Sequence, residues 1–151
     1  MSRILVVYSG DRNRDFFPST NKFIVDSSII NFNEYRNNFT VKIKRVILPS
    51  IALSIPYLTM TISEIDTTID GTNSDLNRAF CILIPKPNVT GTLFTEYTAE
   101  LTDNKLNHNL HKLSISFFAP DGTMFDFGSD TAPGTPVTGS VQTTIIFEIS
   151  E

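Results

Sequence analysis

The sequence predicts an all-β domain, an antiparallel sandwich of two sheets with about eight strands. The composition is the first indication: twelve Phe, no Trp and 19% charged residues are typical of a domain with many strands and turns. Short segments in which apolar and polar residues alternate are the second, and the turn-forming residues between them are the third. A closed barrel is the competing architecture. The long loops at 66–77 and 128–140 favour Greek-key crossovers between two sheets.

The stretch Val41–Ile65 has the densest apolar patterning in the chain. A period of two places one set of side chains on a core face and the other set outside. In its first half, the two alternating sets are Val41, Ile43 and Arg45 against Lys42, Lys44 and Val46. Pro49 and Pro56 lack the N–H group that a continuous central strand needs. Two strands are therefore expected, joined by a kinked connection at 48–57 where the chain passes between the sheets.

The other elements follow from the same alternation and from turn chemistry. Residues 29–38 are expected to form a loop or a broken helical turn, and the polar segment 102–112 has room for one helical turn. A hairpin is expected around Ala119–Thr123, where Pro120 fixes φ and Gly122 accepts a positive φ. Further strands are expected at 3–8, 21–28, 78–84, 92–101, 113–118, 124–127 and 142–150.

The length of 151 residues suits one domain with its own core. Residues 1–20 are interpreted as an N-terminal arm or short strand, and residues 21–151 as the single domain. The apolar run Ile4–Tyr8 is too short for a signal-peptide core or a membrane span, so synthesis in a reducing cytosol is expected. The single cysteine, Cys81, lies in an apolar run and is expected to be a small buried hydrophobe.

The net charge of −4 gives no electrostatic case for binding nucleic acid. The charge is unevenly distributed, however. Residues 1–50 carry eight Lys/Arg against four Asp/Glu, whereas residues 51–151 carry four against twelve. This asymmetry is either ordinary variation along a folded chain or a basic N-terminal part that packs on acidic surfaces of neighbouring subunits.

Catalytic, metal and cofactor chemistry have little support in the sequence, so neither an enzyme nor a cofactor is expected. His108 and His111 lie among Asn residues in a polar segment without further ligands at zinc spacing. The acidic loop at 66–77 could offer oxygen ligands to Ca²⁺. It fails the EF-hand pattern at Thr68 and Asn77, and turn capping is the favoured role of its side chains.

An ordered set of short motifs carries a resemblance. Its residues are Ser9-Gly10-Asp11-Arg12, Pro18 and Phe23, then Val46-Ile47-Leu48-Pro49-Ser50, Ser54-Ile55-Pro56-Tyr57 and Ile62-Ser63-Glu64, and finally Pro120-Asp121-Gly122 and Phe147-Glu148-Ile149. This order resembles small structural proteins of large icosahedral double-stranded DNA viruses, and it covers most of the chain.

The resemblance implies a single jelly roll with an extended N-terminal arm, used as a penton (vertex) protein or a minor capsid protein. It also implies a location in the virion after synthesis in the host cytoplasm. The implied partners are the major capsid protein, neighbouring minor capsid proteins and further copies of the chain itself, with five copies in the ring of a penton. No membrane span is expected.

Two groups of residues are candidates for contacts in such an assembly. In an arm that docks on a neighbour, two buried Phe would contribute several kcal/mol. The alternative is an arm that folds back on its own domain. The arm candidates are Asp11, Arg12, Arg14, Asp15, Phe16 and Phe17, and the exposed loop candidates are Asp66, Asp70, Asn73 and Asp75.

Three other functions remain as alternatives. A minor capsid or cement protein would act by the same kind of assembly contact. A lectin-like, receptor-binding sandwich would present aromatic and Asp/Asn side chains in its loops, although Trp, the usual platform for sugars, is absent. An enzyme on a cupin-like scaffold ranks last, because it would need histidines on strands.

Overall fold

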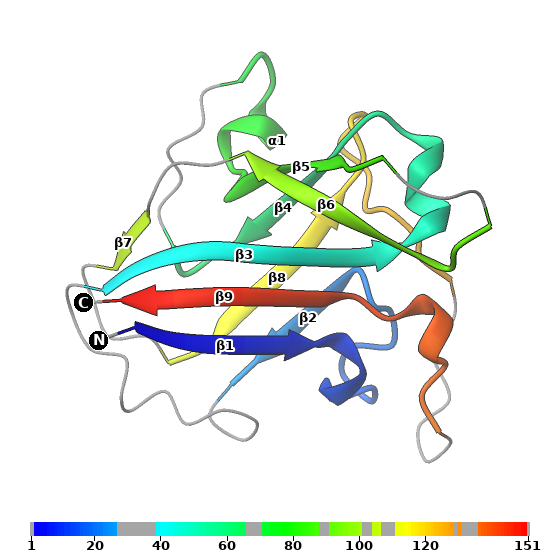
Figure 1. Cartoon of the computed structure of the whole chain (residues 1–151), viewed down its shortest axis with the longest axis horizontal. Helices are drawn as coiled ribbons and strands as arrows, with labels where there is room; N and C mark the ends of the chain where they lie inside the picture. Colours follow the sequence, from blue (N-terminus) through cyan, green and yellow to red (C-terminus); the bar gives the residue numbers. More distant parts are fainter. Residues whose placement is uncertain are drawn as a thin grey trace.

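The computed structural model describes residues 2–26, 39–65, 71–87, 91–100, 104–106, 111–128, 130 and 136–150. They form an all-β domain (Figure 1). In the described part no helix is long and apolar enough to cross a membrane. The strands are β1 (Ser2–Tyr8), β2 (Lys22–Val25), β3 (Phe39–Pro49), β4 (Leu58–Ile62), β5 (Cys81–Pro85), β6 (Phe94–Glu100), β7 (Asn104–Leu106), β8 (Leu113–Phe118) and β9 (Thr144–Ser150). Short helical turns are η1 (Ser9–Asp11), η3 (Ser50–Ser54), α1 (Ser74–Asn77) and η4 (Gly139–Val141).

The strands pair antiparallel throughout, in the order β1-β9-β3-β6-β5-β4-β8-β2, with β7 attached to β3. β3 and β4 follow each other along the chain but are not neighbours in the sheet. The turn η3 joins them, so the chain leaves one part of the sheet for another within the predicted kinked connection. The sheet curls round on itself, and β3 and β9 pass in front of β8 in Figure 1.

The predicted alternation places the core inside this curl. In β8, Leu113, Ile115 and Phe117 are buried and the residues between them are half-buried. β9 repeats the pattern with Ile145, Phe147 and Ile149. Cys81 is fully buried, as expected, and burial raises the pKa of its thiol. The largest fully buried side chains are Phe23, Phe80, Phe117, Phe147, Leu48, Leu58, Met60, Ile62, Leu83 and Ile115.

The alternation in β3 is interrupted, which the sequence did not reveal. Pairing with β9 shifts by one residue between Ile43 and Arg45. Lys44 and Arg45 are both exposed, and Val46 is fully buried. The extra residue is a β-bulge, and it turns the later side chains onto the opposite face of the strand. The prediction that Val46 shares the outer face with Lys42 and Lys44 is therefore wrong.

Two other expectations are modified by the structure. The return strand expected at 124–127 is reduced to a single bridge between Phe118 and Met124. Phe127 is buried there instead, edge-on to Phe117 with 5.5 Å between the ring centroids. In the polar segment 102–112, Asn104–Leu106 form β7, and residues 107–110, which the expected helical turn would need, lie outside the described residues.

The hairpin turn at Ala119–Thr123 is confirmed. The Ala119 amide donates to the Thr123 carbonyl at 2.8 Å, and the Asp121 carboxylate accepts from the Thr123 amide at 3.0 Å. Gly122 has a φ of 86°, in the left-handed region that glycine adopts without steric cost.

Replacing Gly122 by alanine should therefore lower the free energy of unfolding by roughly 1–2 kcal/mol, because a Cβ atom is strained at this φ. Gly139→Ala is the matched control, since a Cβ at Gly139 would meet nothing within 4 Å. Urea unfolding followed by circular dichroism measures both. An equal loss in the two variants would contradict the conformational explanation.

Candidate functional site

The segment after β1 folds back on its own domain and differs from the extended arm that the resemblance implies. Its anchor is Arg12, whose side chain is fully buried. The guanidinium donates to the carbonyls of Phe17, Ser9 and Pro18 at 2.8, 2.9 and 3.0 Å. Through these three hydrogen bonds the segment folds around the guanidinium group of Arg12. Because the segment is polar and has no ladder partner, this side chain supplies the contacts that backbone pairing supplies elsewhere.

Asp130 is the partner of this cation. Its Oδ2 lies 3.3 Å from Arg12 Nη1, and its Oδ1 lies 3.2 Å from Arg14 Nη1. Burial alone would raise the pKa of Asp130, but hydrogen bonds from Gln142 and Thr138 and the charge of Arg12 hold the pKa below its ordinary value. The carboxylate therefore stays ionised at neutral pH. Both arginines of the candidate arm are thus paired within the chain.

Gln142 and Ser9 connect the same network to the sheet. Gln142 Nε2 donates to Asp130 Oδ2 at 2.8 Å, and the Ser9 hydroxyl donates to Gln142 Oε1 at 2.6 Å. Ser9 also accepts from the Thr143 amide at 2.8 Å. The network joins the end of β1 to the start of β9 and to residue 130. The contacts of Ser9 with Gln142 and Thr143 could not be predicted from the sequence, because these partners lie more than a hundred residues away.

The two aromatic residues of the arm, Phe16 and Phe17, differ in burial. Phe17 packs against the hydrophobic core, whereas 77% of Phe16 is exposed. Asp11 and Asp15 are exposed as well. Of the six arm candidates, the structure therefore presents Asp11, Asp15 and Phe16 to solvent and turns Arg12 inward.

The acidic loop is described only in part, since Asp66 and Asp70 lie outside the described residues. Asn73 is exposed, and its side-chain oxygen accepts from the Leu76 amide at 2.9 Å. This bond caps α1, the role that turn chemistry predicts for an Asn at this position. Asp75 lies within α1. Among the described residues, no three His, Cys, Asp or Glu side chains gather where they could hold a metal ion.

An apolar surface that sequence reasoning did not identify lies at the end of the domain where β3 gives way to η3. The Ser50 amide donates to the Leu93 carbonyl at 2.8 Å, and Phe94 pairs with Pro49, so η3 and the start of β6 adjoin there (Figure 1). We call this surface the end patch. Its exposed side chains are Ile51 (58%), Leu53 (41%), Leu93 (68%) and Phe94 (38%).

A second apolar surface covers the outer side of β1. Ile4 and Val6 are 58% and 55% exposed and alternate with the buried Leu5 and Val7. Ile146, half-buried, pairs with Val6 from the neighbouring strand β9. We call this surface the β1 face. Since β1 is an end strand of the sheet order, it also has one edge without a strand partner in the described part of the chain.

Groups of exposed apolar side chains mark interaction surfaces when they are contiguous. The sequence indicates the β1 face only ambiguously. Ile4 and Val6 belong to the continuous apolar run Ile4–Tyr8, which is equally suited to a strand buried on both faces. No protein-family model matches the sequence, and no curated protein matches it.

Proposed function

We propose that the sheet is a single jelly roll and that the chain is a structural subunit of the capsid of a large icosahedral DNA virus. A jelly roll is one long hairpin rolled up, so its strands pair from the ends of the sequence inward. Here β1 pairs with β9, β2 with β8, β3 with β6 and β4 with β5. The contacts β3–β9, β4–β8 and β5–β6 join these pairs side by side. This nesting supports the jelly roll.

The observation that carries the capsid role is the presence of two separate apolar surfaces on one small domain. The end patch and the β1 face together expose six large apolar side chains among the described residues. Desolvating them against neighbours would contribute roughly 25 cal/mol for each Å² buried. The resemblance of the motif order to small capsid proteins also supports the capsid role.

A vertex position is the form of this proposal that the two surfaces favour. A ring of identical subunits needs a heterologous contact, in which two different patches meet between neighbours. A two-fold dimer would need only one self-complementary patch. In the ring, the end patch of each subunit packs on the β1 face of the next.

We expect the purified protein to sediment as a closed ring, and Leu93→Asp and Val6→Asp each to reduce it to monomers. Each aspartate places a charge in a contact that must be free of water. Mixing the two variants should give heterodimers and nothing larger, because each variant retains only one working surface. Analytical ultracentrifugation distinguishes these species.

Thr98→Asp is the matched control, since Thr98 is exposed on β6 and belongs to neither surface. It should assemble like the unaltered chain. A protein that stays monomeric at high concentration and has no affinity for other capsid proteins would refute the proposal. Assembly of Leu93→Asp or Val6→Asp into rings would refute the assignment of the surfaces.

A further inference from the structure

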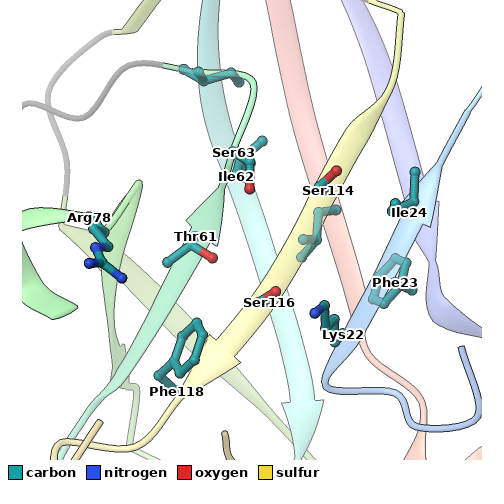
Figure 2. Close-up of a pocket in the computed structure, with 12 residues that line it drawn as sticks. Lys22, Phe23, Ile24, Thr61, Ile62, Ser63, Arg78, Ser114, Ser116 and Phe118 are labelled. Carbon is teal, nitrogen blue, oxygen red and sulfur yellow. The ribbon is translucent and has the colours of Figure 1, made fainter. Parts of the chain in front are cut away.

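A cavity of about 680 Å³ lies over the outer side of β2, β8 and β4, away from both assembly surfaces in the strand order (Figure 2). Its polar lining residues alternate along the strands with the buried core residues Phe23 and Ile115, and atoms of these two residues also line it. Its volume lies within the range of about 300–1,000 Å³ typical of small-molecule sites. The lining residues used below are Lys22, Thr61, Arg78, Ser114, Ser116 and Phe118.

Strand register places a row of hydrogen-bond donors across this cavity. Ser116 of β8 is paired with Lys22 of β2 on one side and with Thr61 of β4 on the other. Neighbouring strands are about 4.8 Å apart, so the three residues span roughly 10 Å across the sheet. Arg78 lies beyond Thr61, and the ammonium group of Lys22 lies beside Ser116 (Figure 2). The row thus begins and ends with a cation.

These donors are not engaged elsewhere in the described part of the chain. No side-chain hydrogen bond or ion pair there involves Lys22, Thr61, Ser116 or Arg78. Glu64, the neighbouring carboxylate, accepts from both the amide and the hydroxyl of Ser114. Each oxygen of this carboxylate therefore accepts a hydrogen bond from Ser114. The cavity therefore combines two cations with the hydroxyl groups of Thr61 and Ser116.

The ring of Phe118 adds an apolar surface next to this row (Figure 2). Phe118 is half-buried, so part of its ring is accessible from the cavity. A sugar matches this combination, because its hydroxyl groups pair with Ser and Thr while its C–H face packs on an aromatic ring. The two cations favour a ligand with negative charge.

We propose that this cavity binds a short acidic oligosaccharide, with one carboxylate or sulfate group paired with Lys22 and a second paired with Arg78. Ser116 and Thr61 hydrogen-bond to its hydroxyl groups, and Phe118 packs against one ring. This binding is independent of the capsid role, because the cavity shares no residue with the end patch or the β1 face.

Isothermal titration calorimetry with sialyllactose, a sulfated heparin disaccharide and neutral lactose tests the proposal. Binding of at least one acidic sugar, with no binding of lactose, is expected. Lys22→Ala and Arg78→Ala should each weaken that binding by about tenfold or more, as loss of a charge-assisted hydrogen bond does. Ser116→Ala should weaken it by a smaller factor, since it removes a neutral partner.

Lys44→Ala is the matched control, because it removes the same charge from an exposed position on β3. It should leave the affinity unchanged. Thermal melts of all four variants check that the fold is retained, which is expected for exposed or half-buried positions.

Failure of both acidic sugars to bind, equal binding of lactose, or an equal loss of affinity in Lys44→Ala would overturn the proposal. Leu93→Asp, the assembly variant, should bind the sugar like the unaltered chain, so the two proposals fail separately.

Discussion

Replacing Arg12 by alanine should lower the free energy of unfolding by about 3–5 kcal/mol, the cost of breaking a buried ion pair from one side. The substitution leaves the buried carboxylate of Asp130 without its main counter-charge. It also leaves the carbonyls of Ser9, Phe17 and Pro18 without the donor that satisfies them. The segment that follows β1 should then detach from the domain, and limited proteolysis should cut it first.

Arg14→Ala is the matched control for this prediction. Arg14 pairs with the same carboxylate at 3.2 Å, but Arg14→Ala leaves Arg12 in place, with its bonds to Asp130 and to three backbone carbonyls, so a smaller loss is expected. Chemical denaturation of both variants, and of Asp130→Asn alone and combined with Arg12→Ala, gives a double-mutant cycle. Losses for Arg12 and Asp130 that simply add would show that the pair is not coupled and would contradict the prediction.

Replacing Phe117 by alanine should cost about 3–5 kcal/mol, the usual effect of removing a buried ring. Phe117 is fully buried in β8 and meets Phe127 edge to face at 5.5 Å. The cavity left behind is lined by strands on both sides of β8, which are fixed by their hydrogen bonds and cannot collapse into it. Thermal or urea unfolding measures the loss.

Phe16→Ala is the same chemical change at a site that is 77% exposed. Its effect on the free energy of unfolding should stay within about 0.5 kcal/mol, as for most surface substitutions. A large loss in Phe16→Ala would mean that this ring packs on the domain in solution. A small loss in Phe117→Ala would mean that the core of β8 is not where the structure places it.

The strands could be predicted from the sequence wherever apolar and polar residues alternate without interruption. Leu113–Phe118 and Thr144–Ser150 both fall in expected strands, because each has one face buried. The hairpin turn was predictable too, since Pro120 and Gly122 have restricted or special φ values. The bulge in β3 was not, because a shift of one residue depends on the partner strand. Two consecutive cations, Lys44 and Arg45, were its only trace.

The candidate site was less predictable than the fold. The motif order drew attention to Arg12, but its burial depends on Asp130, which is 118 residues away in a loop with no pattern of its own. The capping role of Asn73 was predictable because it acts over three residues. The end patch was not, since Ile51 and Leu93 become neighbours only through the pairing of β3 with β6.

The pairing of β1 with β9 has a consequence for biosynthesis. Ser2 pairs with Ser150, so among the described strands the one synthesised earliest has the one synthesised latest as its partner. Until β9 emerges, β1 has neither a ladder nor the contacts of Gln142 and Thr143 that hold its end. Contacts this distant in sequence are typical of domains that fold in milliseconds to seconds. During synthesis Ile4 and Val6 therefore belong to an unpaired strand, the state in which a chain is most vulnerable to aggregation and in which a chaperone would engage it.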